Sequence, residues 1–191
     1  MLSIKEIFEE GRTCNLFSDK EVEDSLLVEI YNLMKLGPTS GNCSPLRIIF
    51  AKSSEQKQKV ISTLMEGNVE KTKSAAVIAI FAYDASFFTS LPKLFPHNSS
   101  FAKMFETNQA LSEETAQRNS ALQAAYFITI ARSLGLDTGP MSGFDSAKLN
   151  EAFFAGTNYK VNFICNLGYK AGPSQYPRLP RLDFDEACKI V

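Results

Sequence analysis

Three polar segments interrupt otherwise apolar elements of the chain, and each could hold a ligand. Residues 11–15 (Gly-Arg-Thr-Cys-Asn) carry Arg12, whose rigid guanidinium suits a phosphate. Residues 36–45 crowd hydroxyls and an amide just after an expected helix, which suits a polar, planar ligand. Residues 136–144 place glycines on both sides of Pro-Met-Ser, so that main-chain N–H groups can approach a ligand closely. Each segment could also be a plain loop or turn, and the segment 178–181 (Arg-Leu-Pro-Arg) could be an exposed tail.

Histidine and cysteine usage excludes several kinds of chemistry. The chain has one histidine, His97, so it cannot build a two-histidine metal site or a HExxH protease. Its setting in residues 94–98, beside a proline, indicates a surface or loop-packing residue. The four cysteines are too far apart for a CxxC motif, and we expect no metal site.

The composition indicates which partners the chain does not suit and which compartment it does. The 191 residues suit one domain, and a net charge of −1 argues against a non-specific nucleic-acid binder. The longest apolar run, Ala75 to Tyr83, is too short to cross a membrane. The N-terminus is acidic and amphipathic rather than a signal peptide, and the scattered cysteines favour a cytoplasmic protein.

Hydrophobic periodicity predicts alternating helices and strands of an α+β protein, with helices in two layers around a sheet. The third polar segment directly follows a long helix that is apolar on nearly all sides, and the second follows an amphipathic one. The expected elements are an N-terminal helix, a helix from a capping box at 18–21 to Gly37, a strand over 47–51, a helix over 55–65, a buried strand over 75–83, short helices in a mobile or inserted segment 84–110, a helix over 112–134, a helix from Asp145 to Phe154, and a strand over 159–167.

Common nucleotide signatures are absent, because the chain has neither GxGxxG nor GxxxxGK[ST]. A nicotinamide cofactor would therefore not be held by a Rossmann turn.

Taken in order, three stretches resemble the FMN-dependent nitroreductase family over nearly the whole chain. Within it, they are most similar to the malonic semialdehyde reductase branch of pyrimidine degradation. The stretches are Gly-Pro-Thr-Ser-Gly-Asn-Cys-Ser-Pro (37–45), Gly-Leu-Asp-Thr-Gly-Pro-Met-Ser-Gly-Phe-Asp (135–145) and Pro-Arg-Leu-Pro-Arg-Leu-Asp-Phe-Asp-Glu-Ala-Cys (177–188).

The resemblance implies a single nitroreductase-like domain over residues 1–191, a three-layer sandwich with a central mixed sheet. It also implies a homodimer that holds FMN at its interface, touched by both subunits. By position, four groups of residues are expected to bind FMN. Those toward the phosphate and ribityl chain are Arg12, Asn15, Arg178 and Arg181, and those from the other subunit are Pro38, Thr39, Ser40 and Asn42. Those at the pyrimidine edge are Asn68 and Lys71, and those with main-chain amides toward N5 and O4 are Pro140, Met141, Ser142 and Gly143.

Two positions depart from the family pattern. Many relatives carry glutamate where this chain has Ser142, so only a main-chain contact is expected there. Cys14 stands at a serine position, and no second basic residue follows Arg12 at the usual spacing, where Asn15 is the expected substitute.

The implied activity is ping-pong hydride transfer, in which NADH or NADPH reduces FMN and a small second substrate is then reduced. The branch implies reduction of a 3-oxo acid, malonic semialdehyde, to 3-hydroxypropionate, with Arg118 and Lys103 as candidate carboxylate donors. The alternatives are a broad nitro, quinone or enone reductase, a flavin-binding protein without turnover, and a structural dimer that binds no flavin.

Overall fold

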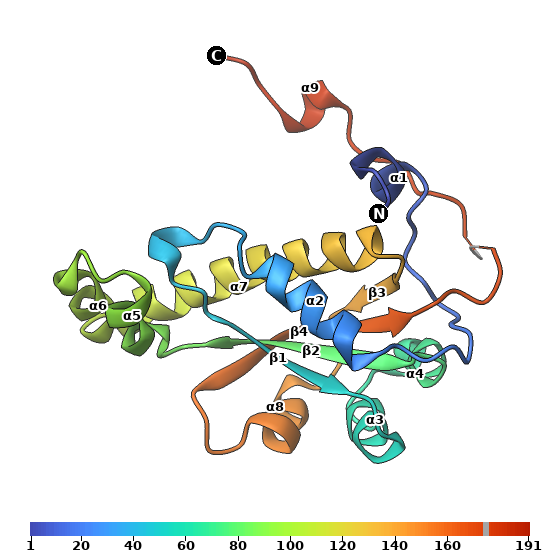
Figure 1. Cartoon of the computed structure of the whole chain (residues 1–191), viewed down its shortest axis with the longest axis horizontal. Coiled ribbons are helices and arrows are strands. Elements are labelled where there is room, and N and C mark those ends of the chain that lie inside the picture. Colours follow the sequence, from blue (N-terminus) through green and yellow to red (C-terminus); the bar gives the residue numbers. More distant parts are fainter. Residues whose placement is uncertain (174–175) are drawn as a thin grey trace.

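Four antiparallel strands form the centre of the molecule, in the order β1-β2-β4-β3 (Figure 1). The computed structural model describes residues 1–173 and 176–191. The strands are β1 (Leu46–Ala51), β2 (Val77–Asp84), β3 (Asp137–Met141) and β4 (Tyr159–Gly168). Every residue of β2 is buried, as its continuous apolar run predicts for a central strand.

Helices cover both faces of this sheet. The helices α2 (Asp24–Met34) and α7 (Gln109–Ser133) lie on one face, and α3 (Ser54–Ile61) and α8 (Ser146–Phe154) on the other (Figure 1). Successive residues of β2 alternate between the two layers: Phe81 packs in the core with α7, and Ile80 in the core with α8. The predicted α+β, three-layer architecture is confirmed. The sheet was expected to be mixed, whereas the described strands pair only antiparallel.

Two expected elements differ because distant parts of the chain compete for their main-chain groups. The capping box at residues 18–21 is wrong, since the Ser18 N–H donates to the Tyr169 carbonyl and α2 begins only at Asp24. The expected helix over 55–65 is α3, which ends at Ile61, and a second helix, α4 (Glu66–Lys73), begins just after the expected range. They are separated where Leu64 forms a β-bridge with Phe144.

Helix ends that depend on local chemistry were predicted correctly. Asp145 caps α8 by accepting a hydrogen bond from the Lys148 N–H, and α7 ends before Gly135, whose φ is +91°. The beginning of α7 differs from the prediction at residue 112. It lies at Gln109 with Asn108 as its cap, while the Ser112 hydroxyl donates to the Ala85 carbonyl.

The segment 84–110 contains the expected short helices. They are η2 (Phe87–Ser90), α5 (Leu91–Leu94) and α6 (Ser99–Glu106). Their aromatic side chains form a separate core in which Phe87 and Phe105 are buried with ring centroids 4.8 Å apart. His97 is exposed and stacks on Phe95, which confirms the surface-loop prediction.

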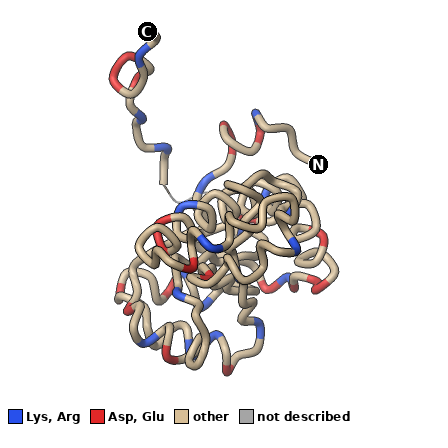
Figure 2. Tube along the Cα trace, turned by 90° about the vertical axis from the view of Figure 1, so that its left-hand side faces the viewer, with Lys and Arg blue, Asp and Glu red and all other residues tan. Residues whose placement is uncertain are grey.

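Both ends of the chain leave the sheet on the side where β3 begins. The remaining elements are α1 (Ile4–Glu9), η1 (Ser40–Asn42) and α9 (Phe184–Ala187). The C-terminal tail, with α9, stands away from the body and carries both basic and acidic residues (Figure 2). Within residues 1–173 and 176–191, no helix has the length and apolar character needed to cross a membrane.

Candidate functional site

Two arginines from opposite ends of the sequence meet at the end of α1. Nη1 of Arg12 donates to the carbonyls of Glu9 and Gly11, at 2.9 Å each. Nη2 of Arg178 donates to the same two carbonyls, at 2.9 and 3.2 Å. Carbonyls at a helix C-terminus lack helical partners and carry partial negative charge, so guanidinium groups are favourable there. The structure therefore brings together two of the three arginines expected at a phosphate.

Arg132, in the last turn of α7, is a third guanidinium in this place, and sequence reasoning missed it. Its Nε donates to the Thr138 hydroxyl at 2.8 Å, and its Nη2 donates to the Arg12 carbonyl at 3.3 Å. Burial lowers the pKa of Arg132 below its usual range, and the charge of Arg178 acts in the same direction. An arginine at the end of an apolar helix looks like an ordinary capping residue in sequence, so no local signal distinguished it.

A cavity of about 260 Å³ adjoins this arginine cluster. Its wall combines basic, acidic and apolar side chains and includes two of the expected site residues, Arg12 and Asn15. To other described residues, the Asn15 side chain makes only a long hydrogen bond, 3.5 Å from its Nδ2 to the Thr13 carbonyl. The other lining side chains with charge are Arg132, Lys170, Glu6, Glu10 and Asp137.

A second group of expected site residues gathers where β3 ends against α4. The Gly143 carbonyl accepts hydrogen bonds from the Met65 N–H at 3.0 Å and from Nδ2 of Asn68 at 2.8 Å. Gly143 must be small, because a Cβ there would lie 2.5 Å from Nδ2 of Asn68. The Gly143 carbonyl thus faces α4, and within the described chain the N–H groups of Ser142 and Gly143 have no acceptor.

Three residues near this strand end carry polar groups that are only partly paired. Met141 accepts a weak contact from the Thr72 hydroxyl. Asn166, fully buried on β4, donates to Thr72 and to the Lys71 carbonyl, whereas its own Oδ1 has no partner among the described residues. Lys71 lies half-buried at the end of α4, and no carboxylate of the described chain forms an ion pair with it. Pro140, one residue before Met141, completes the expected set on β3.

The segment 38–42 is held in a strained turn. Gly41 and Asn42 have φ of +53° and +51°, a left-handed conformation that costs energy for a residue with a side chain. Nδ2 of Asn42 donates to the Leu94 carbonyl, and a Cβ on Gly41 would lie 2.2 Å from the Phe101 ring. The segment is therefore shaped by α5 and α6.

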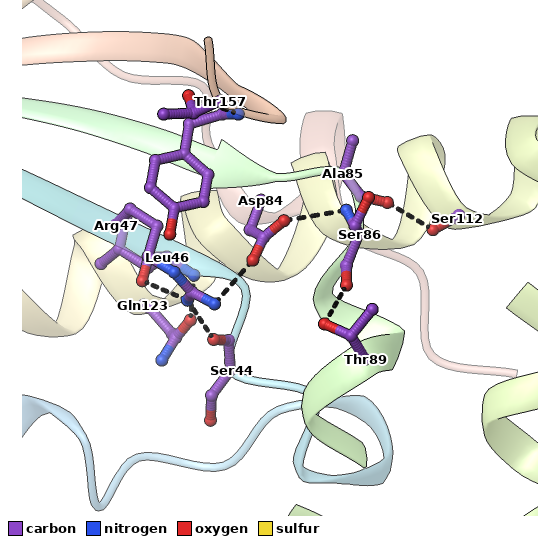
Figure 3. A network of polar contacts seen from close by, with 11 residues as sticks. Ser44, Leu46, Arg47, Asp84, Ala85, Ser86, Thr89, Ser112, Gln123 and Thr157 are labelled. Carbon is purple, nitrogen blue, oxygen red and sulfur yellow. Dashed lines mark hydrogen bonds and ion pairs between the residues drawn. The ribbon is translucent and has the colours of Figure 1, made fainter. Parts of the chain in front are cut away.

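Polar contacts anchor the other side of this turn (Figure 3). Arg47 forms an ion pair with Asp84 at 2.7 Å and also donates to the Ser44 carbonyl. Figure 3 shows Gln123, from α7, accepting the Leu46 N–H, which links the turn and β1 to the long helix. Neither Arg47 nor Asp84 was singled out from the sequence, since their pairing across β1 and β2 is a product of register.

Two parts of the expected site lie against different parts of α7, one near its middle and one at its last turn. The Ser40 N–H donates to Oδ1 of Asn119, whereas Arg132 donates to the Arg12 carbonyl. Thirteen residues separate Asn119 and Arg132, which corresponds to roughly 20 Å along a helix. The turn formed by Pro38, Thr39, Ser40 and Asn42 is therefore far from the arginine cluster within one chain.

Other candidate residues lie apart from both groups. Among the described residues, Arg181 donates only to the Leu179 and Pro180 carbonyls of its own tail, so it does not join Arg12 and Arg178. Arg118 and Lys103, considered as carboxylate donors, are exposed and form local ion pairs with Glu114 and Glu106.

Three groups at the beginning of β4 form a linked set outside these places. Glu113 accepts hydrogen bonds from the Lys160 ammonium at 2.7 Å and from the Tyr83 hydroxyl at 3.0 Å. These contacts lower the pKa of Glu113, the one to Lys160 most strongly. Burial and the Glu113 carboxylate raise the pKa of Tyr83 to about 12.

The thiols are arranged for packing rather than for reactivity. All four cysteines are free, and three of them, Cys14, Cys43 and Cys165, are buried. Burial raises the pKa of Cys43 to about 11 and that of Cys165 to about 12, and it also raises the pKa of Cys14. In the described residues, no group of three or more His, Cys, Asp or Glu side chains is placed to hold a metal ion.

Comparison with known sequences gives a family and close relatives. Residues 9–169 match the nitroreductase family. A protein of Stenotrophomonas maltophilia, provisionally named NADH dehydrogenase/NAD(P)H nitroreductase, is 51% identical over 99% of this chain and 96% of its own length. HadB of Ralstonia pickettii carries the same provisional name and is 48% identical over 100% of this chain and 98% of its own length.

Solved structures share the fold at low identity. A provisionally named nitroreductase of Exiguobacterium sibiricum, solved in complex with FMN, has a TM-score of 0.90 at 18% identity and covers 100% of this chain and 98% of its own. An enone reductase of gut-bacterial fatty acid saturation, CLA-ER, has a TM-score of 0.83 at 15% identity and covers 100% and 99% of the two chains.

Proposed function

This chain belongs to the nitroreductase family, and on that basis we propose that it is an NAD(P)H-dependent FMN oxidoreductase. The observation that carries the proposal is the meeting of Arg12 and Arg178 at the end of α1. A phosphate is the kind of ligand that two guanidiniums recognise through charge-assisted hydrogen bonds. The name of its relatives and the FMN complex of a structural neighbour support the same cofactors.

The residues present fit FMN at two points. Arg12 and Arg178 form no ion pair with a carboxylate in the described chain, where the paired arginines are Arg47 and Arg118. Two main-chain N–H groups, those of Ser142 and Gly143, lack acceptors where the ring edge is expected.

Each group has a distinct task in this proposal. When bound, FMN supplies two-electron chemistry between NAD(P)H and a second substrate. Arg12 and Arg178 bind its phosphate, and the Ser142 and Gly143 amides orient the ring. Lys71 would stabilise negative charge on the bound flavin, while Asn68 would hold the Gly143 carbonyl against α4.

We propose that the working form is a homodimer. The separation of roughly 20 Å along α7 between the Ser40 and Arg132 contacts prevents the turn at 38–42 from reaching the same flavin as Arg12 within one chain. A second copy would supply the turn. Apolar side chains left exposed on α2 and on the C-terminal tail support such an interface, for example Val28, Tyr31, Leu179 and Phe184.

For the second substrate, we propose a small 3-oxo acid, malonic semialdehyde, on the three shared sequence stretches. The nitroreductase name of both close relatives favours a second candidate, broad reduction of nitroaromatics. We place the activity in a reducing cytoplasm, because all four cysteines are free.

Steady-state oxidation of NADH and NADPH by the FMN-loaded protein tests both substrates. The proposal predicts a higher kcat/KM with malonic semialdehyde than with a nitroaromatic compound. Equal or better turnover of the nitroaromatic would favour the second candidate. Oxidation of neither nucleotide with either substrate would remove the proposed enzyme.

A further inference from the structure

Arg132 lies where Arg12 and Arg178 meet, and its contacts are unusual for a helix-terminal arginine. Its guanidinium bridges three parts of the chain: α7, on which it sits, the Thr138 hydroxyl on β3, and the carbonyl of Arg12. It is half-buried, unlike Arg118 on the same helix, whose side chain is 67% exposed. A charged group in such a place is costly unless its donors are satisfied.

Gly11 brings the three guanidiniums together. A Cβ on Gly11 would lie 3.1 Å from Nη1 of Arg132 and only 2.2 Å from the Ile7 carbonyl, so no larger residue fits. The carbonyl of the same glycine accepts hydrogen bonds from Arg12 and from Arg178. Arg132 therefore approaches the backbone of Gly11 while the other two arginines hold its carbonyl.

Arg132 is close to other positively charged side chains and forms no ion pair within the described chain. Arg178 is close enough to act on it by charge, and Arg12 is joined to it by a hydrogen bond. The negative charge of Asp137 stabilises the charged form of Arg132. The same carboxylate also accepts a hydrogen bond from the Lys170 N–H at 2.9 Å. Within the described chain, none of the three arginines forms an ion pair, and Nη1 of Arg132 donates to no acceptor.

We infer that Arg132 belongs to the FMN phosphate site: it positions Arg12 through its main-chain carbonyl and supplies a third positive charge. This inference rests on the proposed function, since it concerns the same cofactor. The contact to the Arg12 carbonyl keeps the backbone of the first phosphate ligand in place. Four basic side chains, Arg12, Arg132, Arg178 and Lys170, lie at this place, against the three acidic side chains that line the cavity, Glu6, Glu10 and Asp137. The remaining positive charge is one that a phosphate would balance.

The test compares FMN with riboflavin, which lacks the phosphate. Binding of both is measured by flavin fluorescence on the full-length apoprotein, for wild type, Arg132→Met and Arg132→Lys, at several salt concentrations. We expect Arg132→Met to weaken FMN binding about tenfold or more, because a charged donor is lost, and to leave riboflavin binding within about twofold. The salt dependence of FMN binding should become shallower in this variant. The FMN affinity of Arg132→Lys should lie between those of wild type and Arg132→Met, because an ammonium keeps the charge and loses the planar pair of contacts.

Two controls separate this role from a purely structural one. Arg118→Met removes an exposed arginine of the same helix and should leave both affinities unchanged. Thr138→Val removes the acceptor of Nε and keeps the charge, so it should weaken FMN less than Arg132→Met does. Circular dichroism confirms that each variant is folded, and if Arg132→Met does not fold, Arg132→Lys and Thr138→Val carry the comparison.

The possible outcomes are distinct. An equal loss of FMN and riboflavin affinity in the Arg132 variants, or no loss of either, would overturn the assignment of Arg132 while leaving the proposed function intact. Wild-type protein that binds neither flavin would overturn the proposed function, and the inference with it.

Discussion

Arg12 and Arg178, near opposite ends of the sequence, donate hydrogen bonds to the same two main-chain carbonyls, those of Glu9 and Gly11. The last carbonyls of α1 thereby hold two guanidiniums side by side. A phosphate could exchange for these carbonyls, since it offers stronger, charge-assisted hydrogen bonds to the same donors.

The shared carbonyls lead to a prediction for the two arginines. Arg12→Ala and Arg178→Ala should each weaken FMN binding by about 1.5–3 kcal/mol, the usual cost of losing a hydrogen bond to a charged group. Equilibrium dialysis with FMN measures the loss. Arg181→Ala should cost less, because that guanidinium binds carbonyls of its own tail. A larger loss in Arg181→Ala than in Arg178→Ala would contradict the assignment.

Gly143 and Gly67 offer a matched pair of glycine substitutions. Gly143→Ala should displace the Asn68 amide, because the new Cβ would lie 2.5 Å from Nδ2, and should lower the free energy of unfolding by roughly 1–2 kcal/mol. It should also weaken FMN binding. Gly67→Ala, on the same helix as Asn68 with no atom within 4 Å of its Cβ, should stabilise by about 0.5–1 kcal/mol. Urea unfolding measures both, and a stabilising Gly143→Ala would rule out the close contact.

The features that the sequence predicts correctly depend on residues close together in the chain, and those that it misses depend on residues far apart in the chain. The Asp145 cap, the Gly135 helix end and the buried strand β2 depend on neighbouring residues, so they were predicted. The capping box at residues 18–21 failed because Ser18 pairs with Tyr169, far along the chain.

Some residues of the candidate site could likewise be identified from the sequence, and one could not. The residue types of Arg12 and Gly143 indicated ligand binding, and the family resemblance added Asn68. The fold brings Asn68 and Gly143 into contact. Arg132 could not be found, because its role depends on Gly11 and Arg178, which only the tertiary structure brings near it.

The buried thiols should resist modification. At pH 8 a thiol-specific reagent should react slowly with Cys14, Cys43 and Cys165 in the native protein, because burial both shields them and raises their pKa. After denaturation all four cysteines should react rapidly, as followed by absorbance and by mass spectrometry of peptides. Rapid native labelling of Cys14 would show that the cavity beside it opens more widely than the structure describes.

Glu113 should make stability depend on pH on the acid side. Its pKa is lowered by Lys160 and Tyr83, so its contribution is present above the ordinary carboxyl pKa and is lost as the pH falls through the lowered value. Glu113→Gln should therefore be less stable than wild type near pH 7, and this difference should shrink near pH 3. Urea unfolding at several pH values measures it. Tyr83→Phe, which removes one donor to the carboxylate, should show a smaller effect in the same direction, and a difference that grows toward low pH would refute the pairing.

The central claim is that this chain binds FMN and passes electrons to it from a nicotinamide. The most direct measurement is anaerobic mixing of the FMN-loaded protein with NADPH, and separately with NADH, while the flavin absorbance near its visible maximum is recorded. The account predicts that at least one nucleotide bleaches the bound flavin rapidly, and that Arg118→Met behaves as wild type. Bound FMN that neither nucleotide bleaches, or a purified protein that retains no FMN when it is supplied, would contradict it.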